Sequence, residues 1–189
     1  ETGLEAVYKE APKITGVKDA RVLKNEDLNI EQLIDELRAR DNIDGDYSEK
    51  VIIDKNTQSK TYPTGTIIID TTSVNTNKVG VYEVTYSVVN SNNRTARRSS
   101  TVVVYDRPTI TETSLSRIEL NSIDSNDEDA IISRLKQAVI AKDGDDELFG
   151  KETKLEVVEH DVNPNLENIY EVTYKATDLN GEETEEVIN

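Results

Sequence analysis

Two short acidic clusters are the stretches of this sequence best suited to chemistry. The first contains Asp41, Asp44, Asp46 and Glu49, and the second contains Asp143, Asp145, Asp146 and Glu147. Calcium takes about six to eight oxygen ligands from carboxylates and carbonyls. The spacing is not that of an EF-hand loop, which places Asp at alternate positions before a Gly. Ligand type therefore predicts a calcium site that stiffens a loop or the junction between units, with candidate ligands Asp41, Asp44, Asp46, Glu49, Asp143, Asp145 and Asp146.

A second interpretation of the same clusters needs no metal. Asp side chains commonly accept hydrogen bonds from backbone amides one to four residues away. Asp41 and Asp143 would then cap local amides, and the other acids would be solvated. The sequence leaves both interpretations open.

The remaining residues offer few candidates for catalysis. The chain has no Cys and a single histidine, His160, which removes disulfides, thiol nucleophiles and most zinc sites. We expect His160 to be an exposed residue at the end of a strand. The 38 acidic residues make carboxylate pairs inevitable, but the lack of Trp and the single Phe argue against a sugar-binding cleft. We therefore expect neither an enzyme nor a catalytic residue.

Charge narrows the class of partner. The net charge of -16 divides into -3 up to Asp106 (14 basic against 17 acidic residues) and -13 from Arg107 onward (8 against 21). Such acidity argues against nucleic acid and anionic lipid, because phosphate binding needs clustered Lys and Arg. Solubility explains the charge most simply, while cations and basic surfaces remain open as partners. No run of about 18 apolar residues is present, so we expect no membrane insertion.

One basic cluster stands apart from this acidity. Arg94, Arg97 and Arg98 follow one another closely after a turn. They could meet an acidic partner or a polysaccharide. Charged residues on an edge strand also block aggregation, and we favour that interpretation.

An internal repeat supplies the framework for these residues. The stretch 80–95 returns as 168–184, and both copies contain Tyr-Glu-Val-Thr-Tyr. Val and Tyr alternate with polar residues in each copy, which predicts a strand buried on one face. We expect two homologous β-domains at residues 1–106 and 107–189, the last strand of the second being shorter than its counterpart. The parent protein is expected to continue beyond it.

Each domain also carries a helical pattern. Asn29 is the predicted N-cap of the first helix, and Ser125 with Glu128 matches a capping box for the second. Both helices are expected to end in Ala-basic-Asp, at residues 39–41 and 141–143. We further expect an extra hairpin within residues 55–78 and a strand at residues 117–120.

The repeated stretch has the pattern of a tyrosine corner. Gly80 would allow a tight turn, Tyr82 would return its hydroxyl to the backbone, and Val84 would point into the core. In the second copy Asn168 replaces the glycine and Tyr170 repeats the tyrosine. Asn is among the residues that best tolerate a positive φ.

The order Pro-x-Ile, a partly helical stretch, Ala-x-Asp with Asp-Gly-Asp, and Gly-x-Tyr-x-Val-x-Tyr resembles the bacterial immunoglobulin-like repeats of Gram-positive cell-surface and secreted proteins. The resemblance covers the chain twice, although the second copy lacks a clean Asp-Gly-Asp. It implies a mainly β fold of two tandem immunoglobulin-like β-sandwich domains, each with a short inserted α-helix. The absence of Cys agrees with a bacterial source, because small extracellular β-domains of animals usually carry disulfides.

The same resemblance implies a function and a setting. Such repeats serve as non-catalytic stalks, spacers or adhesive modules at the cell surface, in the cell wall or in secreted proteins. Their partners would be neighbouring domains of a longer parent chain and a host protein or polysaccharide ligand. An alternative is that the two domains are accessory modules of a large secreted hydrolase whose catalytic domain lies elsewhere.

Overall fold

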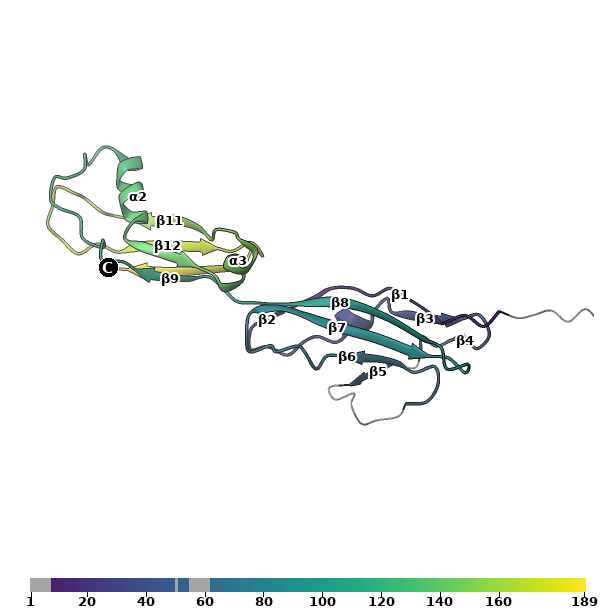
Figure 1. Cartoon of the computed structure of the whole chain (residues 1–189). Helices are drawn as coiled ribbons and strands as arrows, with labels where there is room; N and C mark the ends of the chain where they lie inside the picture. The colour runs from purple at the N-terminus through teal and green to yellow at the C-terminus, as the bar shows by residue number, and fades with distance from the viewer. Residues whose placement is uncertain (1–7, 50, 55–61) are drawn as a thin grey trace, which may run out of the picture. The chain divides into compact units, whose positions relative to one another are not determined.

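The computed structural model of the chain describes residues 8–49, 51–54 and 62–189, with the backbone alone for 52–54. Its internal contacts divide the chain into two compact units, Glu1–Val104 and Tyr105–Asn189. Each unit is a β-structure with its own core (Figure 1). No described helix is long and apolar enough to cross a membrane.

The first unit consists of two sheets and one short helix. One sheet has the order β1-β3-β4 and the other the order β2-β8-β7-β6-β5. The strands are β1 Lys13–Thr15, β2 Ala20–Leu23, β3 Arg38–Asp41, β4 Gly45–Asp46, β5 Val51–Asp54, β6 Ile67–Asp70, β7 Gly80–Val89 and β8 Thr95–Tyr105, and the helix is α1 Glu31–Ile34. In Figure 1 the long strands β7 and β8 run side by side through the middle of this unit.

Alternation along β7 explains how the two sheets pack. Val84, Tyr86 and Val88 are fully buried, while the residues between them face outward. They share one core with Ile14 of β1 and Ala39 of β3, which belong to the other sheet. Burial of each large side chain is worth roughly 1.5–3 kcal/mol. The first unit is therefore a β-sandwich whose two layers are joined by apolar side chains.

The second unit repeats this plan with fewer strands. Its sheets have the orders β10-β9 and β11-β12-β13. The elements are β9 Thr109–Glu112, α2 Glu128–Lys136, β10 Val139–Lys142, α3 Gly144–Phe149, β11 Lys154–His160, β12 Val172–Thr177 and β13 Glu183–Ile188. Ile131 and Leu135 of α2 pack in one core with Val139, Val172 and Tyr174. The prediction of a mainly β chain with two sandwich units and inserted helices is confirmed.

The strand register shows that the two units match residue by residue. Lys13 pairs with Arg40 between β1 and β3, and Thr109 pairs with Lys142 between β9 and β10. Each strand pair follows a proline, Pro12 or Pro108. The tyrosines at the start of the repeated strand act alike too: the hydroxyl of Tyr82 donates to Lys78 O at 2.7 Å and that of Tyr170 to Leu166 O at 3.0 Å.

Gly80 has another role than the one expected from sequence. Gly80 and Asn168 are absent from the positive-φ residues of the described chain. A Cβ at Gly80 would lie 3.3 Å from the ring of Tyr82. The glycine therefore makes room for the tyrosine ring, and positive φ is not what it supplies.

Both helix starts differ from prediction. In α1 the N-cap position is Ile30, although Asn29 Oδ1 still accepts from the Glu31 amide at 3.0 Å. In α2 the cap is Asp127, whose carboxylate accepts from the Ala130 amide at 3.0 Å. Ser125 instead accepts from the Asn165 side chain. Asp lies closer to the first helical turn than Ser does, and either side chain can cap.

The Ala-basic-Asp motifs do not end helices, contrary to our expectation. Residues 39–41 and 141–142 lie in strands β3 and β10. The second acidic cluster opens a further helix, α3, capped by Asp143. Such clusters favour helix N-termini because acidic groups there complement the helix dipole.

Two other expected elements also differ. Strands β5 and β6 pair in parallel, so they do not form a hairpin, and residues 55–61 of the expected segment lie outside the described residues. A parallel pair cannot be joined by a tight turn. Residues 117–120 form no strand.

Candidate functional site

The acidic clusters lie where β3 ends in the first unit and where β10 ends in the second. Asp41 Oδ1 accepts hydrogen bonds from the amides of Ile43 and Asp44 at 2.8 and 2.9 Å. Asp143 Oδ1 accepts from the amides of Asp145 and Asp146, both at 3.0 Å. These two aspartates therefore perform the same capping role, as the interpretation without a metal predicts.

Another aspartate of each cluster, three residues after the capping one, tethers the loop that follows the repeated strand. Asp44 Oδ2 accepts from the Ser91 amide at 2.7 Å. Asp146 Oδ1 accepts from the Leu179 amide at 3.0 Å. Ser91 and Leu179 occupy equivalent places, one residue beyond Asn90 and Asp178.

Asn90 and Asp178 themselves organise that loop in the same way. Asn90 Oδ1 accepts from the amides two and four residues further on, at 3.1 and 2.9 Å. Asp178 Oδ1 accepts from the equivalent amides of Asn180 and Glu182, both at 2.8 Å. The difference between the units lies in the other side-chain atom, which is an amide nitrogen in Asn90 and a carboxylate oxygen in Asp178.

In the first unit this nitrogen completes a hydrogen-bond network. Asn90 Nδ2 donates to Asp41 Oδ2 at 2.9 Å and to Glu10 O at 2.8 Å. Asn90 is 0% exposed and Asp41 is 3% exposed. The Asn90 hydrogen bond is the main reason that the pKa of Asp41 is lowered from its usual value, and the Asp44 amide contributes as well. Both oxygens of Asp41 are therefore occupied.

In the second unit the equivalent network is incomplete. Asp178 has no side-chain N–H, and Asp143 Oδ2 is buried with no hydrogen-bond partner among the described residues. Asp143 is 3% exposed. Burial, followed by a carboxyl–carboxylate hydrogen bond that forms with Asp145 when a proton lies between the two groups, raises the pKa of Asp143 to about 7. An ionised, buried oxygen without a donor is unfavourable, so this position favours either a proton or a cation.

Two further acids lie beside Asp143 in the second unit. Carboxylate oxygens of Asp106, Asp143 and Asp145 all lie within 4.8 Å of one another. Asp106 Oδ1 accepts from the Gly144 amide at 3.1 Å, and Asp145 Oδ1 accepts from the Asp106 amide at 3.2 Å. These contacts fasten the first residues of the unit to the start of α3. We call Asp106, Asp143 and Asp145 the acidic triad.

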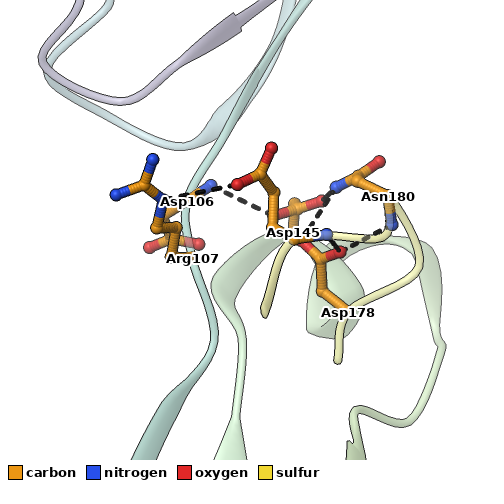
Figure 2. A network of polar contacts seen from close by, with 6 residues as sticks. Asp106, Arg107, Asp145, Asp178 and Asn180 are labelled. Atoms are coloured by element: carbon orange, nitrogen blue, oxygen red, sulfur yellow. Dashed lines mark hydrogen bonds and ion pairs between the residues drawn. The ribbon is translucent and has the colours of Figure 1, made fainter. Parts of the chain in front are cut away.

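Asn180 lies beside Asp145 of the triad and beside Asp178 (Figure 2). Its Nδ2 lies 2.5 Å from Asp145 Oδ2 and 3.3 Å from Asp178 Oδ2. Its Oδ1 is buried and has no partner among the described residues. Rotation of the amide would exchange these two atoms and present a carbonyl oxygen to the triad. The site could thus offer three carboxylates and one amide oxygen to a metal.

The seven predicted ligands do not come together as a single site. Asp44 and Asp146 serve the tethering role described above, and Asp46 Oδ1 accepts from the Ser48 amide at 2.8 Å. Glu49 is exposed. Of the predicted residues, Asp143 and Asp145 belong to the triad, whereas the first unit contributes no such group within its described part.

Sequence reasoning overlooked Asp106, Asp178 and Asn180. Asp106 lies 37 residues before Asp143 in the sequence, so no local spacing links it to the second cluster. A signal for Asp178 exists in the repeat, because the alignment of Tyr82 with Tyr170 places Asp178 opposite Asn90. The exchange of an amide for a carboxylate at a buried turn could have pointed to the site.

His160 differs from its expected exposed position. It is the last residue of β11, and its side chain is 9% exposed. Its Nε2 lies 2.9 Å from Glu128 Oε1, while its Nδ1 is buried without a partner among the described residues. The contact links β11 to the first turn of α2.

Two arginines of the basic cluster lie in β8, where they pair with Ser87 and Tyr86 of β7. Arg97 and Arg98 belong to β8, which lies between β2 and β7 in the sheet order. They border a shallow hollow of about 790 Å³ that also includes Tyr62, Asp70 and Thr85. β2 has four residues and β8 has eleven, so β2 can pair with only part of β8, and the aggregation-blocking interpretation of these two arginines stays a prediction.

Comparison with known proteins identifies one relative by sequence. The chain is 30% identical over 150 residues to the pesticidal crystal protein Cry22Aa of Bacillus thuringiensis. The match covers 79% of this chain but 17% of that protein, so the chain spans about a sixth of its relative. No family model matches the sequence.

Solved structures give weaker similarities. A CBM51-2 and INT domain structure from Clostridium perfringens ZmpB, in complex with GlcNAc, is 16% identical, with a TM-score of 0.35, and the match covers 94% of this chain and 38% of that one. Fibronectin(III)-like modules of Clostridium thermocellum CbhA are 17% identical, with a TM-score of 0.30 and coverages of 93% and 90%. Such TM-scores do not establish a shared fold, and the β-sandwich assignment comes from the strand order and the cores described above.

Proposed function

We propose that the chain is a non-catalytic tandem immunoglobulin-like module of a larger extracellular bacterial protein. Its two domains, the units Glu1–Val104 and Tyr105–Asn189, would act as a spacer that presents neighbouring domains, or as an adhesive module. The match to about a sixth of a much longer bacterial protein supports a role as one module among several.

One observation carries the non-catalytic part of this proposal. Both units use the same buried polar side chains for the same structural purpose, in which an Asp caps the turn after the β3 or β10 strand and Asn90 or Asp178 closes the loop after the repeated strand. The corner tyrosines likewise bind backbone carbonyls. Polar groups that hold turns in both copies serve folding, which is what a repeated spacer requires.

Single-molecule pulling tests the spacer role. We expect two separate unfolding events, one per unit, each releasing up to about 3.6 Å of chain per unfolded residue. A single event that releases the whole chain would contradict independent domains. Incubation with polysaccharide and peptide substrates followed by product analysis tests the non-catalytic claim, which any turnover would overturn.

The adhesive alternative has a defined surface to test. The hollow at Tyr62, Arg97 and Arg98 combines an aromatic side chain with two guanidinium groups. Arrays of acidic polysaccharides and matrix proteins would reveal a ligand, and Arg97→Ala with Arg98→Ala should then reduce binding. Lys13→Ala with Lys9→Ala removes equal charge elsewhere in the unit and serves as the control. Binding that is indifferent to the arginine pair would exclude this hollow, and no binding to any array would favour the spacer role.

A further inference from the structure

We propose that the second unit binds one divalent cation, calcium by the chemistry of its ligands, through the carboxylates of Asp106, Asp143 and Asp145. The proposal is independent of whether the module is a spacer or an adhesin. Three observations support it: the geometry of the triad, the buried Asp143 Oδ2 without a hydrogen-bond donor among the described residues, and the contrast with the first unit.

The geometry suits a single ion. Calcium binds oxygen at about 2.3–2.6 Å, so two ligands on opposite sides of it lie about 5 Å apart. The three carboxylates offer oxygens within 4.8 Å of one another. One ion can therefore reach all three, and the buried carbonyl oxygen of Asn180 becomes a fourth ligand if its amide rotates.

The orphaned oxygen points to a missing positive partner. Asp143 is 3% exposed, and its Oδ1 is used by the α3 amides. Its Oδ2 has no donor within the described part of the chain. A buried polar atom without a partner costs roughly 1–3 kcal/mol, and more when it carries charge. A cation at this point removes that cost.

The first unit is an internal control for this argument. Its residues at the four equivalent positions are Glu10, Asp41, Ile43 and Asn90, whereas the second unit has Asp106, Asp143, Asp145 and Asp178. Two neutral side chains are thus replaced by carboxylates, and Asn90, which satisfies Asp41, is one of them. The second unit thus has four acidic residues at positions where the first unit has two. The negative charge of the two extra carboxylates must be compensated by a cation or a proton.

The donor set favours calcium over other divalent ions. Zinc prefers nitrogen and sulfur ligands, and the triad consists of oxygens alone. Magnesium demands a near-ideal octahedron and retains several waters. Carboxylates on a strand end, a loop and the first turn of a short helix form an irregular set, which the flexible coordination of calcium accepts.

Calorimetric titration of the whole chain with calcium, after chelator treatment, tests the proposal. We expect one saturable site per chain, a higher unfolding midpoint of the second unit in calcium, and weaker binding of magnesium. Asp145→Asn should reduce calcium affinity at least about tenfold, since even outer-shell changes cost ten- to a hundredfold. Asp129→Asn removes the same charge from the exposed start of α2 and should bind as the parent chain does.

Two measurements keep the test decisive if Asp145→Asn disturbs the fold. Hydrogen exchange in chelator reports whether that variant keeps the protection of β12. Asp178→Asn keeps the Oδ1 acceptor that closes the loop, so it should preserve the fold. Its new side-chain N–H, like that of Asn90 in the first unit, would donate to Asp143 Oδ2 and should therefore weaken calcium binding. Absence of saturable binding up to about 10 mM calcium, above the range of weak extracellular sites, would overturn the proposal. Unchanged affinity in folded Asp145→Asn would overturn it as well.

Discussion

Asn90 donates its side-chain amide to Asp41 Oδ2 at 2.9 Å, and the second unit has no counterpart of this hydrogen bond because Asp178 occupies the equivalent position. The capped amides and the closed loop are alike in the two units. One exchanged side chain therefore separates a satisfied buried carboxylate from an unsatisfied one.

Asp178→Asn should stabilise the second unit when no metal is present. The new amide can donate to Asp143 Oδ2, which has no donor among the residues that the structure describes. Relief of a buried unsatisfied group is worth about 1–3 kcal/mol, and a domain of this size gains roughly 4–8 °C in its unfolding midpoint per kcal/mol. Calorimetry in chelator measures the shift. A fall in the midpoint would show that the orphaned oxygen is not the source of instability.

Asn90→Asp should destabilise the first unit by about 1–3 kcal/mol at neutral pH. The change removes the donor to Asp41 and places a second carboxylate beside a buried one. Asn92→Asp adds the same charge two residues away and serves as the control. Urea unfolding followed by hydrogen exchange of β7 peptides measures the loss. Equal effects of the two substitutions would attribute the change to net charge alone.

The tyrosine corners should make small, separate contributions. Tyr82→Phe removes the hydroxyl contact with Lys78 O, and Tyr170→Phe removes those with Asn163 O and Leu166 O. We expect losses of about 0.5–1.5 kcal/mol, confined to the unit that carries the change. Tyr8→Phe, at an exposed tyrosine, is the control. A loss in the unaltered unit would contradict independent folding.

The fold could be predicted from the sequence because apolar and polar residues alternate clearly along the repeated strand. Alternation in Tyr-Glu-Val-Thr-Tyr requires a half-buried strand, and a repeated strand requires a repeated sandwich. Boundaries were harder, since Ser125 and Asp127 can both cap a helix and only packing decides between them. The parallel pairing of β5 and β6 depends on long-range contacts that no local pattern encodes.

The candidate site was only half accessible from sequence. Asp143 and Asp145 attracted attention by their spacing, but Asp106 joins them through folding of distant segments. Most acids of the clusters proved to bind backbone amides, because short acidic side chains in loops satisfy local donors first. Counting carboxylates in a window could not separate these structural acids from the triad. Comparison of buried positions between the two copies could have done so.

Acid should expose the contribution of Asp41 to the first unit. Its pKa is lowered in the folded state, chiefly by Asn90. A lowered pKa means that the stabilisation is complete above the unfolded value, about 3.9, and is lost as pH falls through the folded value. Asp41→Asn lacks this group, so the gap in free energy of unfolding between parent and variant should be largest near neutral pH and should narrow as the pH falls below the unfolded pKa. Urea unfolding across this range, with Asp129→Asn as the control, measures the gap. A free-energy difference that does not change with pH would show that Asp41 acts through packing and not through its negative charge.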